Sequence, residues 1–262
     1  MISSRSNPKV KEIQKLQNSQ RCRQQSQKFV AEGWRLIQEI PSHLIERIYI
    51  QEAQLEKLQS LDSSRDWDIE VVSDSVMKAM SKETTSQGIL ATVHMKPLID
   101  MMSLPKKPLM IALENVQDPG NLGTILRTAD AAGVDMVVLS KGTVDLYNPK
   151  VIKATMGAIF RLNILKDVDL CSYVKELKDK GVHIFAAHLK GEKNHYEGHY
   201  EDGTCFLMGN EGEGLSDELS GHATEYIKIP MRLEAESLNV AVATSILVYE
   251  AIRQRHTNKF NL

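Results

Sequence analysis

Residues 109–133 decide the fold, and they read LMIALENVQDPGNLGTILRTADAAG. The first five are apolar, which is the length of a buried strand, and the following Pro119-Gly120 marks a tight turn. Apolar residues then recur at helical spacing as far as Gly133, and a glycine at that place is typical of a helix end. The stretch therefore predicts a strand, a turn and a helix that begins at Asn121, since asparagine is a favoured N-cap.

The alternation of strands and helices continues toward the C-terminal end. Further runs have the length and apolar character of strands, at residues 136–139, 183–187, 204–208 and 225–229. The last helix is expected at about 239–256 and is apolar nearly all round as far as Ile252. Such a helix should be buried on more than one side, by the sheet and by a partner subunit. The alternation predicts an α/β domain with a parallel sheet covered on both faces.

Residues 96–108 hold three prolines and two adjacent lysines without a clear period, which predicts an inter-domain linker. The linker divides the chain into residues 1–104 and 105–262. The first part has helix patterns at about 8–20 and around Trp34, and strand patterns at 28–31, 45–50, 69–72 and 88–93. We therefore expect a smaller α/β domain before the linker and the larger one after it.

The composition is that of an ordinary globular protein, with 42% hydrophobic and 25% charged residues. No apolar run approaches the roughly 20 residues that span a bilayer, so no membrane association is expected. The N-terminal residues lack the apolar core of a secretory signal, which favours a cytoplasmic location.

The cysteines and histidines do not predict a metal site. Cys22, Cys171 and Cys205 are scattered, which argues against a disulfide framework and a zinc cage, and Cys205 lies in an apolar run that suggests a core position. The His195-x-x-x-His199 pair has a metal-ligand spacing, but Gly198 weakens a helix there and further ligands are missing.

Positive charge is concentrated at the N-terminal end, although the whole chain has a net charge of −2. Residues 1–30 hold seven basic side chains and one acidic side chain, a balance of 7 − 1 = +6. A concentration of positive charge is what an RNA-contacting module needs, because most of its affinity comes from basic side chains that neutralise RNA phosphates. A solvated helix face explains the same charges equally well. The basic residues are Arg5, Lys9, Lys11, Lys15, Arg21, Arg23 and Lys28.

Three segments carry polar residues suited to chemistry. In the first, Arg127 lies in a mostly apolar helix and needs an anionic partner, either an RNA phosphate or a structural salt bridge. The second, FLMGNEGEGL at 206–215, has acids that suit hydroxyl or ammonium groups, although an ordinary acidic turn also fits. Its glycine spacing is not the dinucleotide fingerprint, which argues against a dehydrogenase. In the third, Ser237 and Asn239 stand where a side chain caps the last helix.

Three motifs stand in order along the chain: NLGTILRTA (121–129), GNEGEG (209–214), and IPM (229–231) followed by SLNVAVA (237–243). They resemble the motifs of the SpoU (TrmH-type) branch of the SPOUT RNA 2'-O-methyltransferases. YNPKV (147–151) and TMGAIFR (155–161) are supporting matches. NPKVK (7–11), FVAEG (29–33) and QGILA (87–91) resemble the ribosomal-protein-like RNA-binding domain of many members. The resemblance covers nearly the whole chain.

The resemblance implies an α/β domain with a deep trefoil knot, a homodimer, and S-adenosyl-L-methionine as the cofactor, bound bent in the knot. It implies an active-site set, a cofactor-binding set and, together with the basic end, an RNA-binding set. The active-site residues are Asn121, Arg127, Glu211, Ser237 and Asn239. The cofactor-binding residues are Gly209, Asn210, Ile229, Met231 and Leu238. The RNA-binding residues are Arg5, Asn7, Lys9, Lys11 and Arg127.

The implied reaction is methylation of a ribose 2'-hydroxyl in RNA, and the N-terminal domain favours 23S-type ribosomal RNA. Methylation of tRNA at the same hydroxyl, and a non-catalytic role in RNA binding or ribosome assembly, remain alternatives. A guanidinium rarely releases its proton, so we expect Arg127 to bind a phosphate and stabilise the developing oxyanion rather than act as a base. One position departs from the family pattern, because Leu233 stands where a glycine is common and does not easily adopt positive φ.

Overall fold

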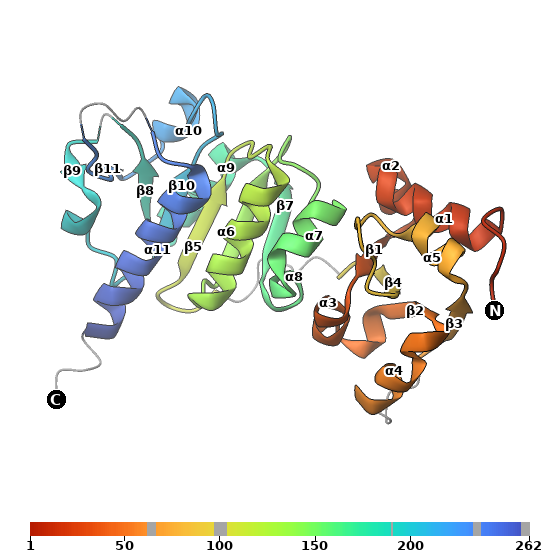
Figure 1. Ribbon diagram of the computed structural model, residues 1–262. Helices are drawn as coiled ribbons and strands as arrows, with labels where there is room; N and C mark the ends of the chain where they lie inside the picture. The colour runs from red at the N-terminus through yellow and green to blue at the C-terminus, as the bar shows by residue number, and fades with distance from the viewer. Residues whose placement is uncertain (62–66, 97–103, 190, 233–236, 258–262) are drawn as a thin grey trace. The chain divides into compact units, whose positions relative to one another are not determined.

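The computed structural model describes residues 1–61, 67–96, 104–189, 191–232 and 237–257 (Figure 1). The chain forms two compact units, each made of two stretches of sequence. The first unit comprises Met1–Pro97 and Asp145–Phe160, and the second comprises Leu98–Val144 and Arg161–Leu262. We call them the N-terminal unit and the C-terminal unit. No helix within the described residues is long and apolar enough to cross a membrane.

The C-terminal unit is built on a seven-stranded sheet with the order β7-β6-β5-β10-β8-β11-β9. All neighbouring strands in it are parallel, which confirms the predicted sheet type. The strands are β5 (Leu109–Leu113), β6 (Met136–Ser140), β7 (Ile164–Val168), β8 (His183–Ala187), β9 (Lys193–Asn194), β10 (Thr204–Met208) and β11 (Glu225–Lys228). Every residue of β5 and β10 is buried, because helices cover both faces of the sheet.

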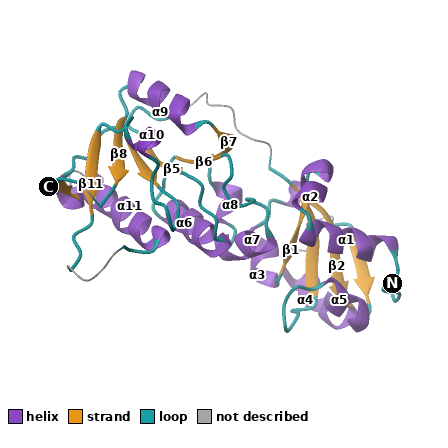
Figure 2. Ribbon diagram, turned by 90° about the horizontal axis from the view of Figure 1, so that it is seen from above, coloured by secondary structure: helices purple, strands orange, loops and turns teal. Residues whose placement is uncertain are grey.

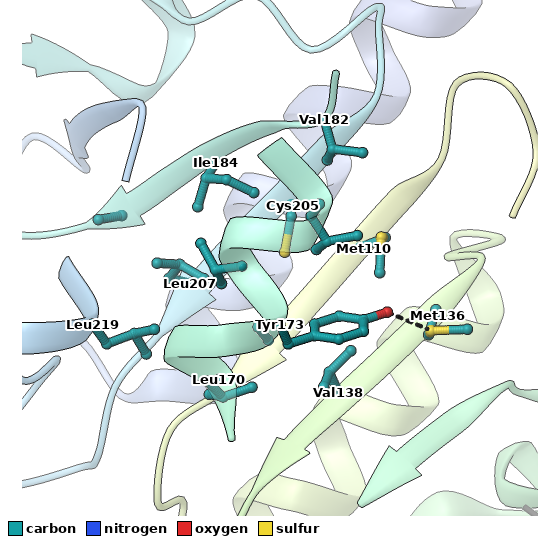
Figure 3. Packing of buried hydrophobic residues seen from close by; sticks show 14 of the residues in the cluster. Met110, Met136, Val138, Leu170, Tyr173, Val182, Ile184, Cys205, Leu207 and Leu219 are labelled. Carbon is teal, nitrogen blue, oxygen red and sulfur yellow. Dashed lines mark hydrogen bonds between the residues drawn. The ribbon is translucent and has the colours of Figure 1, made fainter. Parts of the chain in front are cut away.

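Figure 2 shows α6 and α11 on one side of this sheet and α9 and α10 on the other. The helices are α6 (Pro119–Ala131), α9 (Leu170–Asp179), α10 (Asp217–Ser220) and α11 (Val240–Thr257), with a 3-10 turn, η3 (His195–Glu197). On the α9 side, alternate strand residues such as Met110, Cys205 and Leu207 pack against Tyr173 and Leu219 (Figure 3). Cys205 is fully buried, as expected for a core cysteine.

The N-terminal unit holds a four-stranded sheet with the order β1-β4-β2-β3, in which only β2 and β3 are parallel. The strands are β1 (Lys28–Glu32), β2 (Ile45–Gln51), β3 (Ile69–Val72) and β4 (Ile89–His94). The helices are α1 (Pro8–Asn18), α2 (Gln20–Ser26), α3 (Trp34–Glu39), α4 (Leu55–Leu61) and α5 (Asp74–Met80), with 3-10 turns η1 (Ser42–Leu44) and η2 (Glu52–Gln54). The helix expected at 8–20 ends at Asn18, because Ser19 is extended and caps α2.

Residues 145–160, which follow β6 in sequence, belong to the N-terminal unit. They include α7 (Pro149–Thr155) and most of α8 (Ala158–Arg161). The Asp145 carboxylate forms a buried ion pair with Arg23, and the Tyr147 ring lies 5.0 Å from that of Phe29, centroid to centroid. A single cut near residue 105 therefore does not describe the compact units. The functional division at 104/105 stays a prediction.

The structure corrects the predicted start of the helix after β5. Helix α6 begins at Pro119, and its N-cap is Asp118, whose carboxylate accepts a hydrogen bond from the Asn121 backbone N–H at 2.8 Å. Proline at the first helical position removes an N–H that has no helical partner, which is why the helix starts there. Asn121 thus lies within the first turn, and its side chain is available for other contacts.

Candidate active site

Loops from three strands meet at one edge of the seven-stranded sheet. Residues 114–118 follow β5, residues 209–214 follow β10, and Ile229 follows β11 directly. The strands are parallel, so their carboxyl ends lie at the same edge, which is where ligands bind in open α/β sheets. The three sequence motifs therefore share one site, although 118 residues separate Asn121 in the first motif from Asn239 in the third.

Glu211 is the centre of a hydrogen-bonded cluster. Its Oε2 accepts from the backbone N–H of Gln117 at 3.1 Å. Its Oε1 accepts from the backbone N–H of Asp118 and from Nδ2 of Asn121, both at 3.0 Å. Three donors on one carboxylate hold the loop after β10 against the loop after β5 and the first turn of α6.

The cluster continues from Asn121 to Asn239. Oδ1 of Asn121 accepts from Nδ2 of Asn239 at 2.8 Å. Oδ1 of Asn239 accepts from the backbone N–H of Ala241 at 2.9 Å and of Val242 at 3.3 Å, so Asn239 caps α11. The predicted capping role of Asn239 is confirmed. The same side chain joins the third motif to the other two.

The environment of Glu211 keeps its carboxylate ionised. Partial burial raises its pKa, but the hydrogen bonds from Asn121, Gln117 and Asp118 outweigh burial and hold the pKa below its ordinary value. A carboxylate with a lowered pKa that already accepts three hydrogen bonds is a poor proton acceptor. Its contribution is to orient Asn121 and, through it, Asn239.

Arg127 lies six residues beyond Asn121 on α6, roughly 9 Å along the helix axis at 1.5 Å per residue. Its side chain is exposed, and it makes no ion pair or hydrogen bond with any residue that the structure describes. The structural salt bridge that the sequence left open is therefore absent within the described residues. A guanidinium without a protein partner is free to bind an anion such as an RNA phosphate.

A cavity of about 280 Å³ adjoins the Glu211 cluster. All five predicted cofactor-binding residues line it, and so do Glu211 and Ser237. Ser237 is exposed and makes no hydrogen bond within the described part of the chain. Leu238 is also exposed, at 37%. Leu233, where the sequence departs from the family pattern, lies outside the described residues.

The chemistry of this cavity suits S-adenosylmethionine. Met208, Ile229 and Leu247 give it apolar walls that match a purine, and the carboxylates of Glu211 and Glu213 stand among its lining residues. Negative charge favours the sulfonium and ammonium groups of this cofactor. Small-molecule sites commonly combine apolar walls with a few placed polar groups in this way.

Gly209 is needed for the shape of the loop itself. A Cβ at this position would stand 2.1 Å from the backbone carbon of Gly214. Asn210 and Gly214 exchange two backbone hydrogen bonds of 3.0 Å, which closes the loop into a tight turn. At Gly209 the close approach is therefore that of the protein backbone itself.

The predicted RNA-binding residues of the N-terminal unit have different environments. Lys9 forms an ion pair of 2.5 Å with Glu70, and Asn7 caps α1 by accepting from the Lys9 N–H at 2.9 Å. Arg5 is exposed and donates from Nε to the Ser75 carbonyl at 3.2 Å. Lys11 is exposed. Arg5 and Lys11 are thus the more accessible of the four, and their contacts with RNA stay a prediction.

The histidine pair considered for a metal does not lie on one helix. His195 begins the 3-10 turn η3, and Gly198 after it is extended. Across the described residues, no group of three or more histidines, cysteines or acids is arranged to hold a metal ion.

The sequence did not identify which backbone donors serve the site. The N–H groups of Gln117 and Asp118 bind Glu211, and the carboxylate of Glu114 accepts from Ser216 at its N–H (2.8 Å) and Oγ (2.7 Å). Side-chain type gives no signal for a backbone donor. Glu114 was visible as an acid directly after a buried strand, where polar residues often serve a site.

Comparison with known proteins agrees with this geometry. Residues 108–249 match the SpoU rRNA Methylase family, and residues 7–91 match the MRM3-like substrate binding domain. A relative from Bacillus subtilis (strain 168), named 23S rRNA (guanosine(2553)-2'-O)-methyltransferase RlmP, is 35% identical over 250 residues, covering 95% of this chain and 97% of its own.

Solved structures of similar proteins show the same fold. A crystal structure of an rRNA methyltransferase from Sinorhizobium meliloti is 30% identical, with a TM-score of 0.84 and coverage of 96% of each chain. An AdoMet-bound rRNA methyltransferase structure from the same organism is 29% identical, with a TM-score of 0.82, covering 96% of this chain and 97% of that one.

The fold, the cluster and the cavity define an α/β methyltransferase of the SpoU class. The chain belongs to the SpoU rRNA methylase family, and it carries a substrate-binding domain of the MRM3-like type ahead of the methylase. The resemblance inferred from the three motifs is thereby confirmed.

Proposed function

We propose that this protein transfers a methyl group from S-adenosylmethionine to a ribose 2'-hydroxyl of 23S-type ribosomal RNA. The observation that carries the proposal is the cluster of Glu211, Asn121 and Asn239 beside the cofactor-compatible cavity. A family relative named as a 23S rRNA 2'-O-methyltransferase, similar over nearly its whole length, supports the substrate class.

The residues of the cluster position the ribose for in-line attack. S-adenosylmethionine, when bound, supplies a methyl group already activated by its sulfonium. Holding two reactants in line removes much of the entropic part of the barrier. Asn121 and Asn239 are fixed by Glu211 and α11, so their amides are preorganised, and the exposed side chain of Ser237 stands at the cavity wall.

Arg127 supplies the positive charge in this proposal. Its guanidinium binds the phosphate next to the target ribose and stabilises the oxyanion that develops as the hydroxyl loses its proton. Support comes from its exposure and from the absence of an ion-pair partner among the described residues. The acid Glu211 stays ionised and keeps its role as an anchor.

A homodimer in the cytoplasm is part of the proposal, and so is a trefoil-knotted catalytic domain. Helix α11 supports the dimer, because Val242 and Tyr249, two turns apart on it, are 49% and 50% exposed. Large exposed apolar side chains on the same face of a helix are what a contact surface between two copies would bury. Light scattering on the purified protein tests this; a monomer mass at micromolar concentration would exclude the dimer.

The first experiment is transfer of labelled methyl groups from S-adenosylmethionine to unmodified ribosomal RNA and to transfer RNA, with Arg127→Ala as a control. We expect label in ribosomal RNA at an alkali-resistant linkage, which identifies a 2'-O-methyl ribose. Label in transfer RNA alone would move the substrate to the tRNA alternative.

The non-catalytic alternative has its own signature. A protein that binds RNA in ribosome assembly without methylating it would show no S-adenosylmethionine binding in calorimetry. Cofactor binding without methylation of naked RNA would instead indicate an assembly intermediate as the substrate.

A further inference from the structure

A closed ring of hydrogen bonds joins the loops after β5 and β10. Nδ2 of Asn210 donates to the Asn115 carbonyl at 2.7 Å, and Nε2 of Gln117 donates to Oδ1 of Asn115 at 2.6 Å. The backbone N–H of Gln117 then donates to Oε2 of Glu211 at 3.1 Å. Asn210 and Glu211 are neighbours in sequence, so the ring closes through one peptide bond.

Two members of this region have left-handed backbone conformations. Asn115 has φ +53°, and Gly142, in the loop after β6, has φ +84°. A Cβ on Gly142 would stand 2.9 Å from Oδ1 of Asn115, so only glycine leaves the Asn115 side chain in place. Non-glycine residues in this conformation often cluster at functional sites, where the surrounding structure holds them.

Gln117 links three loops at once. Its Nε2 donates to the Gly142 carbonyl at 2.6 Å as well as to Asn115, and its backbone N–H binds Glu211. Gln117 does not line the cofactor cavity. Its effect on the site therefore passes through Glu211, which in turn orients Asn121 and Asn239.

We propose that Gln117 is a positioning residue for methyl transfer: its side-chain amide fixes Asn115 and Gly142 so that its backbone N–H holds Glu211 in the orientation that aligns Asn121 and Asn239. This proposal deepens the proposed function and rests on it. Its distinguishing consequence is a loss of turnover without a loss of cofactor affinity, because Gln117 touches the Glu211 cluster and not the cavity.

The test is Gln117→Glu, which keeps the shape of the side chain but replaces a donor with a carboxylate facing two oxygens. We expect kcat to fall about 10-fold, as for a small misplacement of reacting groups, and no further than in a variant of Glu211 itself. KM for RNA and Kd for S-adenosylmethionine should stay within about twofold of wild type, since binding contacts are untouched. Lys175→Gln is the matched control: it changes the net charge equally at an exposed α9 residue and should leave kcat unchanged.

Gln117→Leu separates lost donation from added charge. Hydrogen exchange of the peptides covering residues 114–122 and 208–215 is measured on each variant without RNA. We expect faster exchange in both peptides, because the loops after β5 and β10 lose the hydrogen bonds that hold them together. Exchange in the sheet should be unchanged. A wild-type kcat in Gln117→Glu, or unchanged exchange in both variants, would overturn the proposal.

The two proposals fail in different ways. If wild-type protein methylates no RNA, the proposed function fails, and the exchange experiment still decides whether Gln117 holds Glu211. If wild type is active and the variants match it, only the positioning role of Gln117 fails.

Discussion

Arg23 in the N-terminal unit and Arg127 in the C-terminal unit are the same type of side chain in opposite environments. The Arg23 side chain is 5% exposed; it forms an ion pair with Asp145 and donates from Nη1 to the Leu16 carbonyl at 2.6 Å. Arg127 is exposed and has no partner among the described residues. A buried, paired arginine holds a fold together, whereas an exposed, unpaired one is available to a ligand.

The same distinction lowers the amount of positive charge that residues 1–30 can offer to RNA. Of the seven basic residues counted in residues 1–30, Arg23, Lys9 and Lys28 have acidic partners, the latter two in Glu70 and Glu46. Charge that is already paired contributes less to phosphate binding. The accessible positive charge is therefore smaller than the balance of +6 in the sequence suggests.

Removing the buried arginine should give the largest effect on stability. Arg23→Ala leaves the carboxylate of Asp145, 9% exposed, without its partner. Breaking a buried ion pair from one side typically costs about 3–5 kcal/mol of the free energy of unfolding. Urea unfolding followed by circular dichroism measures it. A cost below about 1 kcal/mol would place the pair in the class of solvated surface pairs.

Removing the exposed arginine should act on rate and leave stability unchanged. Arg127→Ala is expected to lower kcat by about 10²- to 10³-fold, the usual effect of deleting a donor that stabilises developing charge. Arg127→Lys should also lose activity, because an ammonium does not bind phosphate in the bidentate manner. Methyl-transfer kinetics measure both variants. A lysine variant with normal turnover and normal folding would contradict the bidentate role.

The carboxylate of the catalytic cluster should give an intermediate effect. In Glu211→Gln, an amide nitrogen faces the N–H donors, and we expect kcat to fall on the order of 10-fold from the lost hydrogen bonds. The lowered pKa of Glu211 means that its contribution is complete above the ordinary carboxyl pKa and lost only as the pH falls through the folded-state value.

The ratio of wild-type to Glu211→Gln rates should therefore be constant between about pH 6 and 8. A pH profile of methyl transfer in both proteins checks this. A ratio that rises with pH across this range would show that Glu211 titrates there and takes a proton during the reaction.

A surface ion pair in the N-terminal unit should give the smallest effect. Lys153 pairs with Glu83 at 2.6 Å, but its side chain is 65% exposed. Exposed pairs typically contribute about 0–1 kcal/mol, because solvent and salt screen them. Lys153→Ala, measured by the same urea unfolding, sets the scale for Arg23→Ala. A larger loss than that of Arg23→Ala would reverse the comparison.

Several elements could be read from local patterns. The strands predicted at 183–187 and 204–208 have the bounds found in the structure, because a continuous apolar run marks a strand buried on both faces. Strand β7 was missed, since it lies at the edge of the sheet and carries Lys166 and Asp167 among its apolar residues. Helix α9 was also missed, although Leu170, Tyr173, Val174 and Leu177 stand at helical spacing.

By itself the sequence determined the parallel sheet, the motif residues and their order, because periodicity and turn residues act over a few neighbours. Only the tertiary structure decided which arginine is buried, that residues 145–160 belong to the N-terminal unit, and that Glu211 binds Asn121 across 90 positions. Burial and hydrogen-bond partners depend on which segments the fold brings together. A pattern over a few neighbouring residues does not identify partners that are far apart in the sequence.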